Sequence, residues 1–487
     1  MPHALFPIPL FPIPYTPHPT PHTLIAIMLK IFELILAIAL LVVAAILRSP
    51  SLANYREGLF WLCLVGGAIL IFAQIFFLRR ARDRRIKLIS FLVLAVSFAS
   101  LSTNLTLAIK FNLVKQSVLD AEPSRLAKLG QHFVVGYRDS EEIAALIEKR
   151  AIGGVFITAR NIEGKSKTEI QQEILGWQET RRRQGLSPLW IAADQEGGIV
   201  SRLSPPLTYL PPLSEIIAEN IDIEESKKAA IEYAELQGRE LAEIGINLNF
   251  APVVDLNKGA LNPEDKYSLI YKRAISADKD VVAKVASWYC QTLEKHRVGC
   301  TLKHFPGLGR VAADTHVEDA ELNASLEELR EDDWVPFRAV IENTRSLIML
   351  SHAKLMAVDS DRPVSFSHKA IVNILREDWQ YDGILITDDF CMRAAYNNKL
   401  GLAGAIVAAM NASVDLILIA FDSDLYYPAM HFLLQAEAAG KLDKAMLEKS
   451  RRRLLDWEWG MEHRALGIGH WALGIGRSEK SKVKSQK

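Results

Sequence analysis

The residues with the clearest chemical potential lie in one loop, between Lys303 and His316. This loop follows a short apolar run, Gly299–Leu302, and contains the Gly and Pro residues that end a regular element. Asp314 and His316 are two residues apart, so the carboxylate can hydrogen-bond the imidazole, fix its tautomer and raise its basicity. By composition alone such a loop is more often an ordinary surface loop, but the pair indicates acid/base chemistry.

Further polar side chains follow apolar runs that predict buried strands. They are Asp194, Asp255, His304, His352 and Asp388. The carboxyl ends of barrel strands are where α/β barrels hold their reactive groups. One such group means little, because strands often end at Asp or His, but five together predict a single concave site.

Eight short apolar runs alternate with amphipathic stretches after residue 125. The expected strands are Phe133–Tyr137, Gly154–Thr158, Leu189–Ala193, Ile246–Pro252, Gly299–Lys303, Leu347–Ser351, Gly383–Thr387 and Val414–Ala420. The expected helices are Ser140–Lys149, Lys167–Arg183, Ile223–Glu243, Asp278–His296 and Leu326–Glu342. This alternation predicts parallel strands and right-handed crossovers, as in a (β/α)8 barrel of the TIM type. A doubly wound open sheet is the alternative, although no G-x-G-x-x-G follows the first strand.

Three apolar runs precede the barrel region. The first run, Ile31–Leu47, contains Glu33, which lies one helical turn from Lys30. The other two runs, Leu59–Leu78 and Leu88–Ile109, are long enough to cross a bilayer. A buried core helix is the alternative for the third run, and a cleaved signal peptide fits poorly because apolar runs follow the first. The expected organisation is a disordered Pro-rich lead (1–23), a membrane segment of three helices (24–110), the barrel (120–465) and a Gly-repeat and Lys/Ser-rich tail (466–487).

Charge in the loops predicts the orientation of the membrane segment. The loop Arg79–Lys87 is densely basic, whereas only Arg48 and Arg56 lie between the first and second runs. The positive-inside rule places the dense cluster in the cytoplasm. The third helix then exits on the other side, which predicts a periplasmic or extracellular barrel.

The composition narrows the possible partners. Lys and Arg together number 57, as do Asp and Glu, and this zero net charge argues against a nucleic-acid partner. The four cysteines, Cys63, Cys290, Cys300 and Cys391, have no metal-site spacing, which predicts neither a zinc site nor a disulfide framework. The sequence does not indicate an oligomeric state.

Several motifs resemble those of glycoside hydrolase family 3, in particular its single-domain β-N-acetylhexosaminidase branch. The matching stretches are Lys303–Gly309 with Asp314–His316, Asp194–Gly198 (Asp-Gln-Glu-Gly-Gly), Asn247–Asp255 and Thr387–Met392. The chain departs from the pattern at Leu308, where the branch usually has His, at Ile199 in place of Arg, and at Ala274 and Ile275 beside Arg273. The similarity covers about residues 125–460.

The resemblance implies a role for each matching residue. Asp388 would be the nucleophile, and Asp314 with His316 the acid/base dyad. Hydroxyl and N-acetyl groups of the sugar would be held by Asp194, Arg202, Arg273, Lys303 and His304. His352 would either bind the sugar in the pocket or fill the barrel mouth. Asp389 would support Asp388. Asp255 and Asn249 would accept hydrogen bonds from, or donate them to, backbone groups at the strand ends. No metal or cofactor is implied.

The expected activity is that of a retaining exo-β-N-acetylhexosaminidase, which releases terminal N-acetylglucosamine from cell-wall or chitin-like glycans through a covalent glycosyl-Asp intermediate. A phosphorylase, in which phosphate attacks the same intermediate, is one alternative. Another is an inactive, membrane-tethered sugar-binding module, against which the joint presence of Asp314, His316 and Asp388 argues. Binding of a metal by His304, Asp314 and His316 is weakly supported, because they lack a compact ligand spacing.

Overall fold

The computed structural model describes residues 21–217 and 222–465. The chain forms two compact units, Met1–Asn112 and Leu113–Lys487. The tail 466–487 and most of the expected lead lie outside the described residues. Pro21–Thr23, which were expected in the disordered lead, instead begin the first helix.

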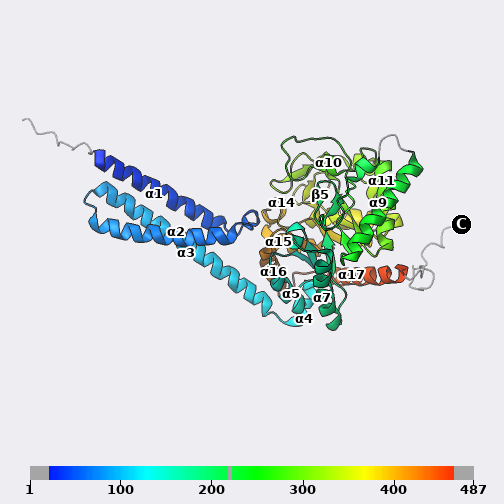
Figure 1. Cartoon of the computed structure of the whole chain (residues 1–487), viewed down its shortest axis with the longest axis horizontal. Coiled ribbons are helices and arrows are strands. Elements are labelled where there is room, and N and C mark those ends of the chain that lie inside the picture. Colours follow the sequence, from blue (N-terminus) through cyan, green and yellow to red (C-terminus); the bar gives the residue numbers. More distant parts are fainter. Residues whose placement is uncertain (1–20, 218–221, 466–487) are drawn as a thin grey trace, which may run out of the picture. The chain divides into compact units, whose positions relative to one another are not determined.

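Three long helices account for the expected membrane segment (Figure 1). They are α1 (Pro21–Ile46), α2 (Arg56–Arg80) and α3 (Arg84–Leu119). Each is long and apolar enough to cross a membrane, and within the described ranges these three helices alone meet that criterion. The molecule therefore has three candidate membrane spans.

A polar cluster lies between α1 and α2. Lys30 donates to the carboxylate of Glu33 at 2.8 Å and to the side-chain oxygen of Gln74 at 3.0 Å. Gln74 in turn donates to Glu33 at 2.8 Å, and the Lys30 ammonium lies 3.8 Å from the ring centroid of Phe77. Lys30 and Glu33, one helical turn apart, thus form an ion pair. Burying charges in an apolar bundle is costly unless they are paired, and this arrangement gives each one a partner.

The second unit contains an eight-stranded parallel barrel. In spatial order its strands are β11 (Leu385–Thr387), β9 (Leu347–Leu350), β7 (Gly299–Phe305), β6 (Leu248–Asn249), β3 (Trp190–Ala193), β2 (Gly154–Ile157), β1 (Phe133–Gly136) and β12 (Ile417–Ile419). A parallel bridge between Ile386 and Leu416 joins the two ends of this order. The predicted TIM-type barrel and all eight predicted strands are confirmed; the open-sheet alternative is wrong.

Short strands outside the barrel were not expected. They are the antiparallel pair β4 (Gln195–Gly197) and β5 (Val200–Ser201), and the parallel pair β8 (Ala320–Leu322) and β10 (Ala353–Leu355). Each lies in a segment that follows the carboxyl end of a barrel strand. These pairs therefore build up the end of the barrel where the candidate site lies.

Helices surround the barrel (Figure 1). The longer ones are α4 (Pro123–Gly130), α5 (Ser140–Glu148), α7 (Lys167–Arg183), α9 (Ile223–Glu243), α11 (Lys279–Lys295), α12 (Leu326–Glu331), α13 (Val335–Asn343), a π-helix (Lys369–Asp378), α15 (Gly401–Asn411), α16 (Tyr426–Ala438) and α17 (Lys444–Ala465). Short helical turns are α6 (Ala159–Ile162), α8 (Leu213–Ile216), α10 (Ile270–Arg273) and α14 (Arg393–Tyr396).

The expectation of one continuous helix over Leu326–Glu342 is wrong, because α12 ends before Asp332 and α13 begins at Val335. The backbone of Asp332 departs from helical geometry at φ −129° and ψ −85°. Pro336 also lies in the first turn of α13, where its missing N–H is tolerated.

Large apolar side chains fill the barrel, and α17 covers its amino-terminal end. Phe156 and Phe250 stack inside it with ring centroids 5.7 Å apart. Trp457 of α17 packs against Trp190 at the start of β3 and donates its indole N–H to the carbonyl of Arg345, just before β9. With one end covered, the opposite end of the barrel is left for the site.

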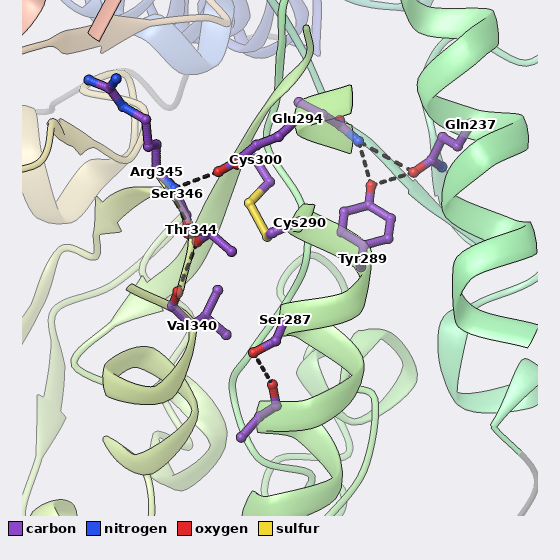
Figure 2. The surroundings of a disulfide bond; sticks show 12 residues. Gln237, Ser287, Tyr289, Cys290, Glu294, Cys300, Val340, Thr344, Arg345 and Ser346 are labelled. Atoms are coloured by element: carbon purple, nitrogen blue, oxygen red, sulfur yellow. Dashed lines mark hydrogen bonds between the residues drawn. A yellow bond between two sulfur atoms is a disulfide. The ribbon is translucent and has the colours of Figure 1, made fainter. Parts of the chain in front are cut away.

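The prediction that the chain has no disulfide is wrong. Cys290 in α11 and Cys300 in β7 are bonded, with their Cα atoms 5.6 Å apart (Figure 2). The chain reverses between them through Arg297, whose φ of 59° is left-handed, so that β7 runs back along the end of α11. Spacing along the sequence does not reveal this reversal, and the pairing could not be read from the cysteine positions alone.

Candidate active site

A buried network of charged side chains forms the floor of the site. Lys303, two residues before the end of β7, donates to Asp194 at 2.8 Å and contacts Glu196 at 2.6 Å. Arg273, at the end of α10, holds both oxygens of Glu196 through Nε and Nη2, at 2.9 and 2.7 Å. Three loops are thus fixed together by charge-assisted hydrogen bonds, which are stronger than neutral ones.

Glu196 is the residue of this network that sequence reasoning did not single out. Burial alone would raise its pKa, but Arg273 and Lys303 outweigh burial and lower the pKa to about 2. Glu196 is therefore an anion that orients two cations. Its place in the Asp194–Gly198 motif was the available signal, and only the fold reveals that Arg273 and Lys303 converge on it.

Asp255 organises the loop after β7. Its carboxylate accepts hydrogen bonds from the backbone N–H groups of His304 and Leu308, and it lies 2.7 Å from Nδ1 of the His304 ring. Asp255 thus satisfies backbone groups, as expected, and also fixes the His304 imidazole. The Nε2 atom of His304 lies 3.4 Å from Arg273, at the edge of the charged network.

Two glycines allow the loop to approach Asp255 closely. Gly307 has a φ of 115°, which side chains disfavour, and a Cβ on Gly309 would meet the carbonyl oxygen of Leu256 at 2.1 Å. Between them, Leu308 is 6% exposed and packs against Ile270 and Ala274 in an apolar cluster. Two departures from the family pattern, Leu308 and Ala274, therefore share one buried cluster.

Asp388 follows β11 directly and is half-buried. Burial opposes its ionisation, but electrostatic interactions with His304, His352 and His316 outweigh burial and lower its pKa. The backbone N–H of Asp389 also donates to its Oδ1 at 2.8 Å. These contacts hold Asp388 as a carboxylate.

Asp389 has a different environment from its neighbour. Its carboxylate accepts hydrogen bonds from the backbone N–H groups of Cys391, Ala420 and Phe421. Burial raises its pKa despite these bonds. Asp389 thus connects the segments after β11 and β12, and its expected support of Asp388 stays a prediction.

His352 lies in the barrel mouth, fully buried. Its Nδ1 is 2.7 Å from the hydroxyl of Ser365, and its Nε2 is 3.1 Å from the carbonyl of Asp389. Burial lowers its pKa. Both ring nitrogens have protein partners, which favours a supporting role under Asp388; direct substrate contact stays a prediction.

The expected Asp314–His316 pair is present. His316 Nδ1 lies 2.7 Å from Asp314 Oδ1, which also accepts the His316 backbone N–H at 2.9 Å. Burial would lower the pKa of His316, but the hydrogen bond to Asp314 and the charges of Asp388 and Asp314 raise it. Because the charge of Asp388 contributes to this raised pKa, Asp388 and the dyad lie near each other.

The loop that carries this pair is fixed to the segment after Asp388. The backbone N–H of Arg393 donates to the His316 carbonyl at 3.2 Å, and the Arg393 side chain donates to the Val317 carbonyl at 3.1 Å. The loop that carries His316 and the segment that follows Asp388 are therefore directly connected.

Two sequence-predicted positions lie at the edge of the β4–β5 pair. Arg202 is exposed, and its backbone N–H donates to the Asp194 carbonyl at 3.1 Å. Ile199, where the family pattern has Arg, is 49% exposed at the turn of the pair. The role of Arg202 in sugar binding stays a prediction.

The chain is similar to known proteins over the barrel. Residues 125–457 match the glycosyl hydrolase family 3 N-terminal domain. A β-hexosaminidase of Xanthomonas oryzae is 33% identical over 288 residues, 59% of this chain and 81% of that protein. The β-hexosaminidase LpqI of Mycobacterium tuberculosis is 30% identical over 329 residues, 66% of this chain and 80% of that protein.

A solved structure has the same fold. It is a family 3 β-N-acetylglucosaminidase from Paenibacillus, with a TM-score of 0.63 and 27% identity, and the match covers 72% of this chain and 65% of that one. The family match extends over most of the second unit and includes every candidate site residue named above. The chain belongs to glycosyl hydrolase family 3 and is a glycoside hydrolase.

Proposed function

We propose that this chain is a retaining exo-β-N-acetylglucosaminidase that removes terminal N-acetylglucosamine from glycans of the cell-wall or chitin type. The observation that carries the proposal is the pairing of an ionised Asp388 with the Asp314–His316 dyad at one end of the barrel. The names of the similar β-hexosaminidases and of the Paenibacillus β-N-acetylglucosaminidase support the choice of an amino sugar.

In the proposed first step, a carboxylate oxygen of Asp388 attacks the anomeric carbon. The bond from that carbon to the leaving oxygen breaks, and His316 gives a proton to this oxygen. The low pKa of Asp388 suits an attacking carboxylate, which also offsets the positive charge that develops on the sugar. The raised pKa of His316 suits a group that must hold a proton near neutral pH.

In the second step, His316 takes a proton from water, and the water oxygen attacks the same carbon and releases Asp388. Each of the two displacements inverts the anomeric carbon, so the configuration of the product is that of the substrate. Asp194, Arg273, Lys303 and His304 are proposed to bind the sugar, since the charged network holds their polar groups at the carboxyl ends of β3, β6 and β7.

The test is turnover of 4-nitrophenyl N-acetyl-β-glucosaminide by the detergent-solubilised full chain, with and without phosphate. Asp388→Asn should lower kcat by about a thousandfold or more, since it removes the nucleophile. Asp382→Asn is the matched control, because Asp382 is 85% exposed in the loop before the same strand. Equal activity in both variants would refute the assignment, and a phosphate-dependent sugar phosphate product would favour a phosphorylase.

We also propose that the barrel lies on the outer side of the membrane. One support is the basic segment from Arg79 to Lys87, at the end of α2 and the start of α3, which the positive-inside rule assigns to the cytoplasm. The second is the Cys290–Cys300 disulfide, because disulfides persist in oxidising compartments and are rare in the cytosol (Figure 2). The basic segment and the disulfide are independent arguments, and both support a barrel outside the cytoplasm.

Alkaline phosphatase fused after residue 120 tests this orientation, because the reporter folds only in an oxidising compartment. An active fusion is expected. Inactive alkaline phosphatase, together with fluorescence from a green fluorescent protein fused at the same residue, would place the barrel in the cytoplasm.

A further inference from the structure

An exposed aromatic side chain lies beside the dyad. Tyr267 is 60% exposed, and its ring centroid is 5.9 Å from that of His316, with 34° between the ring planes. It belongs to the segment between Asp255 and α10, which sequence reasoning did not connect with the site. An exposed aromatic ring beside a proton donor has a face free to contact a ligand.

The backbone at Tyr267 is held in place. The Asp265 carboxylate accepts hydrogen bonds from the N–H groups of Tyr267 and Ser268, at 3.0 and 2.9 Å. The Ser268 carbonyl accepts a hydrogen bond from Arg273 Nη1 at 2.9 Å. Tyr267 is thus connected through one residue to the arginine that holds Glu196, so its ring is positioned relative to the site.

The proposed proton transfer from His316 places the leaving group of the substrate beside Tyr267. His316 Nδ1 is engaged by Asp314, which leaves Nε2 to protonate the glycosidic oxygen. The leaving group is attached to that oxygen, so it must lie next to His316 on the side away from Asp388. Tyrosine offers a flat apolar face and a polar tip, which match the C–H face and hydroxyl rim of a sugar ring.

We infer that Tyr267 is a specificity residue that stacks on the sugar ring of the leaving group, so that the preferred substrates carry a pyranose and not only a small aglycone. The inference rests on the proposed function, because it takes His316 as the proton donor. Tyr267 takes no part in the bond changes. It contributes binding energy to the part of the substrate that departs.

The test compares two substrates in the full chain. N,N′-diacetylchitobiose has a sugar as leaving group, whereas N-acetyl-β-glucosaminyl fluoride has no ring there. Tyr267→Ala should lower kcat/KM for the disaccharide about tenfold, equivalent to about 1.4 kcal/mol, and leave the fluoride unchanged. Tyr267→Phe keeps the ring face and should retain most of the disaccharide activity.

Two outcomes would overturn the inference. An unchanged disaccharide rate in Tyr267→Ala would exclude the stacking role. A loss on the disaccharide accompanied by a shifted alkaline limb of its pH profile would show that Tyr267 only positions His316, because the fluoride leaves with little help from a proton donor and would not reveal such a role. If the unmodified chain turns over neither substrate, the proposed function fails by itself. Calorimetry then decides the inference: the disaccharide should bind more tightly than N-acetylglucosamine, and Tyr267→Ala should remove this difference.

Discussion

Replacing Asp314 with Asn tests the dyad most directly. Asn is nearly isosteric and can still accept the Nδ1–H hydrogen bond, so the change removes mainly a charge. Asp314 is 3% exposed, and solvent therefore screens its interaction with His316 only weakly. Because the Asp314 hydrogen bond is the strongest of the influences that raise the pKa of His316, the variant should have a lower His316 pKa.

The size of the effect of Asp314→Asn follows from the difference between a hydrogen bond to a charged group and one to a neutral group. Hydrogen bonds to charged groups contribute about 1.5–3 kcal/mol and neutral ones about 0.5–1.5 kcal/mol. The substitution should therefore remove roughly 1–2 kcal/mol of stabilisation of the protonated imidazole, about a 5–30-fold loss of kcat/KM. This loss applies to substrates whose leaving group needs a proton.

The assay is kcat/KM against pH for aryl N-acetyl-β-glucosaminides with phenols of different acidity. The activity of the unmodified chain should fall at alkaline pH as His316 loses its proton, and in Asp314→Asn this fall should begin at lower pH. Acidic phenols leave without help and should lose little. An unmoved alkaline limb, or an equal loss for every phenol, would refute the role of Asp314 in holding the proton on His316.

Two further predictions concern stability, measured by denaturant unfolding. Glu196→Gln should cost about 3–5 kcal/mol at neutral pH, because it leaves Lys303 and Arg273 buried without their shared anion. Because the pKa of Glu196 is lowered to about 2, its contribution is complete above its ordinary value of 4.5 and is lost as the pH falls toward 2, so the difference from the unmodified chain should shrink over that range. Replacing Cys290 and Cys300 together with Ser should cost about 2–3 kcal/mol, the entropy of closing a short loop, and reducing agent should then have no further effect; an unchanged stability would contradict a formed bond.

The barrel was predictable because its strands are short, apolar and separated by turn residues. Each of the eight expected runs contains a strand of the sheet. The dyad was predictable for a local reason: an Asp and a His two positions apart on one loop have few other geometries. The observed 2.7 Å contact needs no information from distant segments.

Contacts between distant segments were not predictable in this way. Glu196 meets Arg273 across 77 positions and gains its role only when β4 and α10 come together. The disulfide depends on a left-handed turn at Arg297 that composition does not indicate. Such features depend on the path of the backbone, which hydrophobic periodicity alone does not give.

The departures from the family pattern look different in the folded chain. Considered separately, the departures at Leu308 and Ala274 cast doubt on the fit of the sugar, because Leu308 stands where the family branch usually has His and Ala274 lies beside Arg273. In the structure both are buried in one apolar cluster with Ile270, and a buried polar group there would need its own partner. Ala274 directly follows Arg273, and the N–H of Leu308 is held by Asp255. The paired apolar residues therefore pack together the two loops that carry Arg273 and His304, so these departures are compatible with an intact charged network.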